Sequence, residues 1–325
     1  MQIIVAGASG RLGQNFLKYC AKERLSVVAL VRKNSYTGNI SAKIPIRSVD
    51  YSQAGFGELK QALADATHIV NLTGSTDSSL SLNQLRQANV QATKMLLDAA
   101  PSKLEKFVHL SSISVYGKKF SGVQDESSPR RAYGNYGISK LEGEQLVLSY
   151  ANRLNVIILQ PGMIYGPGFK EGFYPVLKNL SSNKMAIVGS GENHIPLVHI
   201  DDVSKAIACA CASQKSVCGS CYLIVTEPQL TQNQLMEIAS AALKVPAPSK
   251  HINYSFLRLA ACAKMLYNSL MGKKSSLTIE MIDQLYYERC FSSKKATSAL
   301  GWKPSVSFKM GIEEVVNQFQ KEQKG

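Results

Sequence analysis

Residues 1–13 read MQIIVAGASGRLG, an apolar run at 2–6 followed by glycines at positions 7, 10 and 13. The run has the composition of a buried strand, and the residues from 11 onward have a helical pattern. Glycines between a strand and a helix let backbone N–H groups approach a pyrophosphate at the helix N-terminus, where the helix dipole favours negative charge. The stretch therefore predicts a dinucleotide-binding turn, with a tight structural turn as the alternative. The predicted phosphate-side contacts are Gly7, Ser9, Gly10, Arg11, Leu12 and Gly13.

The alternation of strand and helix continues through the first half of the chain. Near-continuous Val/Ile/Leu strands that alternate with helices are typical of a parallel sheet covered on both faces. We expect an α/β fold, a Rossmann-type doubly wound parallel sheet. The predicted strands are 2–6, 26–31, 44–49, 68–72, 106–111 and 155–160, and the predicted helices lie near 11–23, 56–64, 79–99 and 136–152.

After residue 160 the pattern changes and helices predominate. We expect them near 201–213, 231–243, 254–270, 277–287 and 307–320, with a strand at 221–225. A chain of 325 residues is longer than one compact core usually holds. We therefore expect residues 1–165 to form the dinucleotide-binding domain, to which the chain returns at about 197–225. Residues 166–196 and 226–325 then form a smaller, mostly helical lobe for the substrate.

The end of the second strand indicates which dinucleotide binds. An acid about 20 residues after the turn would hold the ribose 2′-hydroxyl of NAD, but residues 30–34 read LVRKN. Arg32 and Lys33 suit a 2′-phosphate, so we favour NADP(H) over NAD(H). The alternative is a solvated strand end, with Val31 at the critical position. Asp50, which closes the third strand, is placed to accept a hydrogen bond from an adenine amino group.

Residues 132–140, AYGNYGISK, contain the candidate acid/base group. On a helix, Tyr136 and Lys140 are i and i+4 on one face. Tyr133 shares that face but lies seven residues before Lys140, about 10 Å from it along the axis. Only Tyr136 is then close enough for the ammonium to stabilise its phenolate. A nearby cation, helped by an oxidised nicotinamide, lowers a phenol's pKa and lets it exchange a proton with a substrate oxygen. A helix surface without chemistry is the alternative.

These motifs, taken together, resemble the extended branch of the short-chain dehydrogenase/reductase superfamily, the NAD-dependent epimerase/dehydratase family. Within it the chain is similar to 3-beta-hydroxysteroid dehydrogenase-like and dihydroflavonol reductase-like enzymes. The resemblance covers nearly the whole chain. It is carried by GASGRLG (7–13), Asp50, NLTG (71–74), ANVQAT (88–93), LSSISVYG (110–117), YGISK (136–140), QPGMIYGPG (160–168), PLVHIDDV (196–203) and LGWKPSVSF (300–308).

The resemblance implies roles for individual residues. Ser112 polarises the reacting oxygen, Tyr136 is the acid/base, and Lys140 tunes Tyr136 and binds the nicotinamide ribose. Asn89 supports the proton relay. Further cofactor contacts are implied for Tyr51, Leu72, Thr73, Gly74, Pro161, Gly162, Met163 and Ile164.

Three functions stay open. We favour an NAD(P)(H)-dependent oxidoreductase that moves a hydride at a secondary alcohol or ketone, because three features of the sugar-nucleotide enzymes are missing. Residues 160–168 lack their asparagine, residues 189–202 lack their arginine, and residues 111–115 lack the dehydratase acid pair. The alternative is a nucleotide-sugar 4-epimerase, which returns the hydride to its substrate. A non-catalytic dinucleotide-binding scaffold is disfavoured by the intact Ser112, Tyr136 and Lys140. The substrate is accordingly an apolar ketone or alcohol, or a nucleotide sugar.

Charge and composition limit the partners. Lysine and arginine number 37 against 23 acids, a net charge of +14 that favours anionic ligands. The cations are spread along the chain without a nucleic-acid-binding motif, so we expect no nucleic acid. Residues 254–271 form an apolar helix interrupted by Arg258 and Lys264. We favour its packing in the small lobe, with an apolar substrate or peripheral membrane contact as alternatives.

Localisation, metal binding and assembly are expectations of the same kind. No signal peptide is evident and the seven cysteines suit a reducing compartment, so we expect a cytoplasmic protein. We expect no metal: Cys209, Cys211, Cys218 and Cys221 have a cluster-like spacing, but the first two point to different faces of a helix. The family resemblance implies a homodimer formed through the helices near 79–99 and 136–152.

Overall fold

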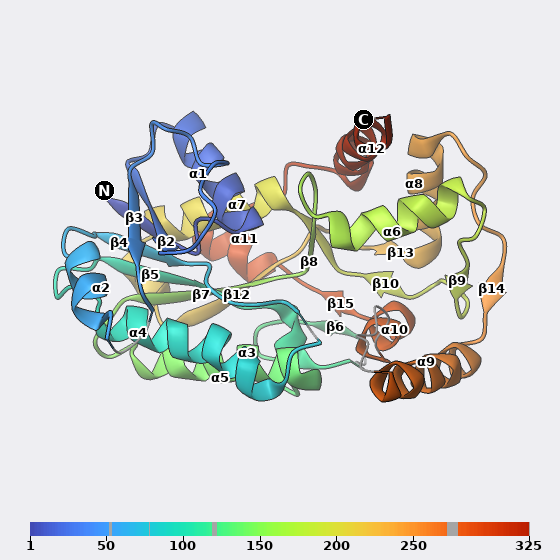
Figure 1. Ribbon diagram of the computed structural model, residues 1–325, viewed down its shortest axis with the longest axis horizontal. Coiled ribbons are helices and arrows are strands. Elements are labelled where there is room, and N and C mark those ends of the chain that lie inside the picture. The colour runs from blue at the N-terminus through green and yellow to red at the C-terminus, as the bar shows by residue number, and fades with distance from the viewer. Residues whose placement is uncertain (52–53, 78, 119–121, 272–278, 325) are drawn as a thin grey trace.

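A computed structural model describes residues 1–51, 54–77, 79–118, 122–271 and 279–324 (Figure 1). Its main element is a seven-stranded parallel sheet of order β12-β7-β5-β4-β1-β2-β3. The chain starts in the middle of the sheet at β1, runs outward through β2 and β3, and then returns to the other side at β4. This change of direction confirms the doubly wound Rossmann-type fold and leaves a crevice at the carboxyl ends of β1 and β4. The strands are β1 (Ile3–Ala6), β2 (Val27–Arg32), β3 (Ile46–Val49), β4 (His68–Asn71), β5 (Lys106–Leu110), β7 (Val156–Pro161) and β12 (Ser220–Ile224).

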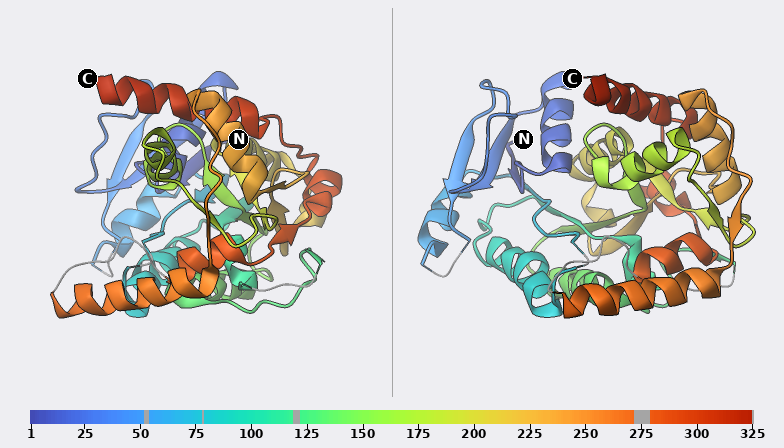
Figure 2. Two further views of the ribbon diagram at one scale, coloured as in Figure 1. Left: turned by 90° about the vertical axis from the view of Figure 1, so that its right-hand side faces the viewer. Right: turned by 45° about the vertical axis from the view of Figure 1, so that its right-hand side comes forward.

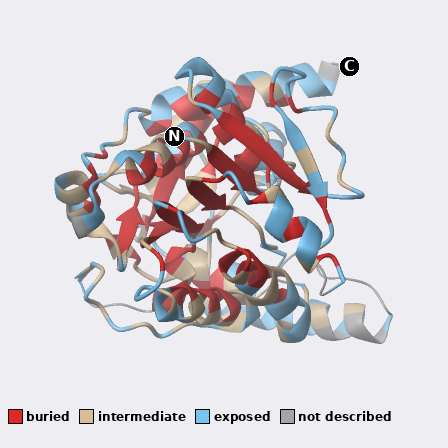
Figure 3. Ribbon diagram, turned by 90° about the vertical axis from the view of Figure 1, so that its left-hand side faces the viewer, coloured by how far each residue is buried: buried red, intermediate tan, exposed pale blue. Residues whose placement is uncertain are grey.

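Helices cover both faces of the sheet, and the buried residues concentrate in the strands between them (Figures 1 and 3). One face carries α1 (Arg11–Lys22), α7 (Ile200–Ala212) and α11 (Lys294–Leu300). The other carries α2 (Phe56–Ala62), α3 (Leu82–Arg86), α4 (Ala92–Asp98) and α5 (Gly134–Ser149). Every residue of β1, β4 and β7 is buried, as expected of central strands in a sheet covered on both faces.

The helix predicted near 79–99 is interrupted. Ser81 caps α3 through a capping box with Gln84, and a π-helical segment, η1 (Gln87–Gln91), separates α3 from α4. A π-turn widens the backbone locally and is common at functional sites. Asn89 lies at the centre of this segment.

A second core lies beside the sheet. Helices α6 (Lys170–Ser181), α8 (Gln232–Leu243) and α12 (Phe308–Lys324) pack around Phe173, Leu235 and Ile312. Short strands outside the main sheet form two-stranded pairs: β8 (Met163–Tyr165) with β11 (Leu197–His199), β9 (Ile187–Val188) with β14 (His251–Ile252), β10 (His194–Ile195) with β13 (Leu230–Thr231), and β6 (Val123–Gln124) with β15 (Cys290–Phe291). Two 3-10 turns, η2 (Ile113–Tyr116) and η3 (Lys215–Val217), complete the elements. The domain boundaries that we placed on the sequence stay a prediction.

The sequence motifs at 196–203 and 300–308 meet in space. The Trp302 indole donates to the Asp202 carbonyl at 2.9 Å, and the Asp202 carboxylate accepts from the backbone N–H groups of Ser305 and Val306 at 2.7 and 3.1 Å. Asp202 and Trp302 are fully buried. These bonds fix the start of α12 against α7, which explains why the two motifs occur together.

Two expectations for the second half need correction. We did not predict α6, which contains Pro175, or the short α11. We favoured a core position for α9 (Tyr254–Leu270), but this helix lies at the edge of the molecule (Figure 2). Of its described side chains only Ala261 is buried. The predicted helix 277–287 is α10 (Ile279–Tyr286); residues 277–278 lie outside the described part.

Candidate active site

The glycine turn lies at the crevice between β1 and β4. Gly7 has φ +82°, and a Cβ there would lie 2.7 Å from the carbonyl carbon of Leu72. Gly10 is the N-cap of α1. A Cβ on Gly13 would lie 2.4 Å from the Gly7 carbonyl oxygen. Gly7 and Gly13 therefore exclude side chains for different reasons, and the turn presents backbone to the groove above it.

A groove of about 1270 Å³ runs from this turn across the ends of β2, β3 and β4. Ten of the predicted cofactor-binding residues line it: Gly7, Ser9, Gly10, Arg32, Lys33, Asp50, Tyr51, Leu72, Thr73 and Gly74. Leu12 and Gly13 do not line it; the Leu12 side chain is buried beneath the turn. The glycine cradle and the extent of the groove fit a dinucleotide.

The two cations at the end of β2 differ in their surroundings. Lys33 Nζ donates to the Glu58 carboxylate at 2.9 Å, and both side chains are about half exposed. Arg32 is exposed and lies close enough to Tyr51 to act on its phenol, whose pKa is nevertheless raised by burial. Arg32 is therefore the cation better placed for a ligand in the groove.

A cavity of about 390 Å³ continues the groove past Leu72, Thr73 and Gly74, which line both. It brings together the four predicted catalytic residues, Asn89, Ser112, Tyr136 and Lys140, with the predicted nicotinamide contacts Pro161, Gly162, Met163 and Ile164. Arg11 also lines this cavity, where its guanidinium lies 4.8 Å from the centre of the Phe169 ring. The residues come from η1, the loop after β5, α5 and the end of β7.

Ser112 and Tyr136 face each other within the cavity. Ser112 Oγ lies 2.9 Å from Ser114 Oγ and accepts from the Ser114 backbone N–H at 3.2 Å, which fixes its position after β5. Burial raises the pKa of the Tyr136 phenol above its ordinary value of 10.0, and an interaction with Ser112 opposes the rise. We expected the Lys140 ammonium to lower this pKa; burial instead raises it, and Ser112 is the group that opposes the rise.

Lys140 is held by the backbone. Its Nζ donates to the Leu110 carbonyl oxygen at 2.6 Å, and its side chain is buried. Burial lowers the pKa of Lys140 to about 8, although the Glu144 carboxylate one turn further along α5 opposes that shift. Glu144 accepts in turn from Gln160 Nε2 at 2.7 Å. The lysine therefore has a fixed position and a pKa near the physiological range.

We predicted that Tyr133 shares the helical face of Tyr136, and this prediction is wrong. It is the N-cap of α5, with extended φ and ψ of −129° and 138°. Its ring lies 4.0 Å from Lys118 Nζ, and the side chain is exposed. The helix begins at Gly134, so Tyr133 lies just outside it and away from the face that carries Tyr136 and Lys140.

Asn89 connects two parts of the site through its side chain. Its Oδ1 accepts from the Ser75 backbone N–H at 2.7 Å, and its Nδ2 donates to Ser139 Oγ at 2.8 Å. Ser139 Oγ donates to the Tyr136 carbonyl oxygen at 2.8 Å. Asn89 therefore ties the loop after β4 to the turn of α5 that carries Tyr136.

Several residues of the cavity wall were not predicted. They are Phe169, Glu280, Gln284 and Arg289, of which the last three come from α10 and the segment after it. They lie about 30 to 150 residues from Tyr136 in sequence, so no local pattern indicated their place. Pairing of β15 with β6 brings the segment after α10 to the cavity.

Metal and membrane features can be stated for the described part of the chain. No group of three or more His, Cys, Asp or Glu residues lies in an arrangement that could hold a metal ion. All seven cysteines are free thiols. No helix among the described residues is both long and apolar enough to cross a bilayer.

Comparisons with known proteins show the family of the chain. The family model described as the NAD dependent epimerase/dehydratase family matches residues 3–224. An N-acetyl-alpha-D-glucosaminyl-diphospho-ditrans,octacis-undecaprenol 4-epimerase of Escherichia coli O157:H7 is 25% identical over 91% of this chain and 89% of its own. A 3beta-hydroxysteroid-dehydrogenase/decarboxylase of Arabidopsis thaliana is 28% identical over 91% of this chain and 72% of its own.

A solved structure shares the fold. The UDP-glucuronic acid 4-epimerase from Bacillus cereus, in complex with NAD, superposes with a TM-score of 0.76 over 99% of each chain. The two sequences are 21% identical, so this likeness concerns the fold alone.

Proposed function

The chain belongs to the NAD-dependent epimerase/dehydratase family, enzymes of the extended short-chain dehydrogenase/reductase type, and we propose that it is an NAD(P)(H)-dependent oxidoreductase acting on a secondary alcohol or ketone. The observation that carries the proposal is the meeting of Ser112, Tyr136 and Lys140 in one cavity that continues the glycine-turn groove. Residues 160–168 and 189–202, which lack the features of sugar-nucleotide enzymes, favour this reaction over epimerisation.

The side chains divide the work at the substrate oxygen. When bound, the nicotinamide supplies or accepts the hydride. In the reducing direction, Tyr136 donates its phenolic proton to the oxygen as the carbon gains the hydride, and Ser112 donates a hydrogen bond to the same oxygen. The Lys140 ammonium stabilises the phenolate that remains. The reverse direction uses the same groups with Tyr136 as base.

A second function has its own support. The relative from Escherichia coli, which is 25% identical over 91% of this chain, is named as a 4-epimerase. An epimerase would use the same Ser112, Tyr136 and Lys140 but return the hydride to its substrate, so no net cofactor is consumed.

One experiment distinguishes the two functions. The protein is mixed with stoichiometric NADPH or NADH and a panel of ketones, including apolar ketones, and separately with nucleotide sugars. An oxidoreductase loses nicotinamide absorbance in proportion to the product. Conversion of a nucleotide sugar at constant absorbance would replace our proposal with the epimerase. Binding of the cofactor without turnover of any of these substrates would favour a dinucleotide-binding scaffold.

We also propose that the cofactor is NADP(H) rather than NAD(H). The support is Arg32, an exposed cation in the groove at the position where an acid would hold a ribose 2′-hydroxyl. Lys33 contributes less to this preference because Glu58 already pairs with it.

We also propose that the protein acts in the cytoplasm and has two further partners, an anionic membrane surface and a second copy of the chain. The outer side of α9 exposes Phe256, Leu259 and Tyr267 by 69, 71 and 60%, and Arg258 and Lys264 lie on the same helix. An apolar surface with cations suits an anionic membrane. Co-sedimentation with phosphatidylglycerol vesicles, against neutral vesicles, tests that contact.

Light scattering tests the homodimer that the family resemblance implies.

A further inference from the structure

Arg289 is a buried cation that has no partner among the residues that the structure describes. The residue is 3% exposed, and its Nε makes no hydrogen bond within the described part of the chain. Within the described part of the chain, no carboxylate lies within ion-pair distance of its guanidinium, and no acceptor bonds to it. Burial alone lowers the pKa of Arg289 to about 10, so the side chain still carries its charge at neutral pH. Charged side chains are rarely buried unless they are paired.

The acid of the same cavity wall is already engaged. Glu280 lies against the N-terminus of α5, where it accepts from the Asn135 backbone N–H. A Cβ on Gly134 would lie 1.9 Å from Glu280 Oε1, which shows how closely the carboxylate approaches that helix end. Glu280 is therefore engaged at the helix end, and no carboxylate of the described residues forms an ion pair with Arg289.

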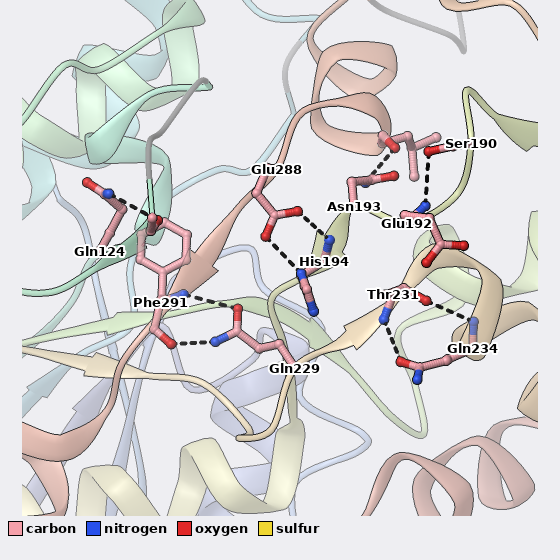
Figure 4. A network of polar contacts seen from close by, with 12 residues as sticks. Gln124, Ser190, Glu192, Asn193, His194, Gln229, Thr231, Gln234, Glu288 and Phe291 are labelled. Atoms are coloured by element: carbon pink, nitrogen blue, oxygen red, sulfur yellow. Dashed lines mark hydrogen bonds and ion pairs between the residues drawn. The ribbon is translucent and has the colours of Figure 1, made fainter.

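The backbone on both sides of Arg289 is fixed, as Figure 4 shows. Before it, the Glu288 carboxylate accepts from the His194 backbone N–H at 3.0 Å and lies 2.8 Å from His194 Nδ1. After it, the Phe291 backbone N–H donates to Gln229 Oε1 at 3.1 Å, and Gln229 Nε2 donates back to the Phe291 carbonyl. The segment therefore holds Arg289 in the wall of the cavity that contains Ser112 and Tyr136.

This arrangement is unfavourable for the protein alone. Removing a guanidinium from water without a compensating partner costs stability, and an apolar residue would fill the same space without that cost. An anion that enters the cavity would supply the missing acceptor. A guanidinium presents its N–H groups as a planar fork that matches a carboxylate or a phosphate in two parallel hydrogen bonds.

We propose that Arg289 is the specificity-determining residue of the active site and that the substrate carries an anionic oxygen group, a carboxylate or a phosphate, which pairs with Arg289. This inference rests on the proposed function for the reacting carbon, and it adds a second point of attachment. With the reacting oxygen at Ser112 and Tyr136 and the anion at Arg289, the substrate is bound at two places in one cavity of about 390 Å³.

The experiment separates binding from turnover. Octanoate, octyl phosphate and octanol are titrated into the protein saturated with reduced cofactor, and the shift in melting temperature gives the affinities. Reduction of 3-oxo-octanoate is compared with reduction of its methyl ester. The variants are Arg289→Gln, the charge-conserving Arg289→Lys, and Arg131→Gln as a matched control at an exposed arginine before α5.

We expect one of the two anions to bind wild type about ten- to a hundred-fold more tightly than octanol, the effect of a hydrogen-bonded charge pair. Arg289→Gln should abolish this preference, Arg289→Lys should retain part of it, and Arg131→Gln should retain all of it. The anion that binds identifies carboxylate or phosphate as the substrate group. If a carboxylate is the group, the acid should be reduced with a kcat/KM at least tenfold above that of the ester.

Other results overturn the inference or separate it from the proposed function. Anions that bind wild type no better than octanol overturn it, as does an unchanged preference in Arg289→Gln. Should Arg289→Gln fail to fold, wild type and Arg289→Lys decide the question alone. An anion preference that depends on Arg289, without reduction of any ketone, would retain the anion site and reject the oxidoreductase. Reduction of ketones without an anion preference would do the opposite.

Discussion

Lys140 and Leu110 are joined by a hydrogen bond of 2.6 Å, from the ammonium at the middle of α5 to the last carbonyl of β5. The contact places a charged side chain in the interior, next to Ser112 and Tyr136, before any ligand binds. Its position is thus determined by the sheet, and its charge is maintained against burial. The buried Lys140 ammonium therefore lowers the stability of the fold while it supports catalysis.

The first prediction concerns Lys140→Met. The pKa of Lys140 falls from an ordinary 10.5 to about 8 in the native state, so at pH 7 the protein carries a desolvated charge that costs on the order of 3 kcal/mol. Between pH 8 and pH 10.5 the unfolded chain keeps the proton that the native state has released, so native stability rises with pH in this window. Met removes the cost, and the variant should be at least as stable as wild type at pH 7 while losing nearly all turnover.

Urea unfolding of both proteins at pH 7 and pH 10 measures this effect. The advantage of the variant should shrink at the higher pH. A variant that is several kcal/mol less stable than wild type at pH 7 would show that the bond to Leu110 outweighs the burial of the charge.

The second prediction compares two tyrosines. Tyr136→Phe removes the transferable proton and should lower kcat by roughly a hundred- to ten-thousand-fold, with cofactor affinity within a few-fold of wild type. Tyr133→Phe is the control, because Tyr133 lies outside the helix and its ring contacts Lys118. Steady-state kinetics and cofactor titration of both variants provide the test. An active Tyr136→Phe together with an inactive Tyr133→Phe would refute the assignment.

The third prediction tests the glycine turn. An alanine at Gly7 would need φ +82° and would place a Cβ 2.7 Å from Leu72, so Gly7→Ala should abolish cofactor binding and destabilise the fold by about 1–3 kcal/mol. Gly57→Ala in α2 meets nothing within 4 Å and should leave stability unchanged or raise it by up to about 1 kcal/mol. Thermal unfolding and NADPH titration compare the two. Normal cofactor affinity in Gly7→Ala would contradict the predicted role of the turn.

The fourth prediction concerns the cofactor. A charge-assisted contact to phosphate is worth about 1.5–3 kcal/mol, so wild type should prefer NADPH over NADH by roughly ten- to a hundred-fold. Arg32→Asp should reverse the preference, because an acid accepts from the free 2′-hydroxyl and repels the phosphate. Lys33→Ala should have a smaller effect, since Lys33 already pairs with Glu58. Equal affinities in wild type, unchanged in Arg32→Asp, would identify these cations as a solvated strand end.

The sequence alone determined the sheet and the first part of the site. Strands β1 to β5 and β7 are apolar runs bounded by turns, and their pattern is local, so each was predicted to within about two residues of its observed bounds. The glycine turn follows from the same local order of strand, glycines and helix. Tyr136 and Lys140 are four residues apart on one helix, and that spacing needs no tertiary information.

Tertiary structure decided the features that depend on contacts between distant segments. The spacing within residues 132–140 could not show that Tyr133 lies just before α5, and so it wrongly placed Tyr133 on the helical face of Tyr136. The composition of α9 suggested a core helix, although burial depends on which neighbours a helix meets, and this one meets few. Arg289 lines the cavity from the segment between α10 and β15, and Glu280 of the same wall is engaged at the start of α5. Local propensity determines elements, whereas the electrostatic environment of a side chain is a property of the packed whole.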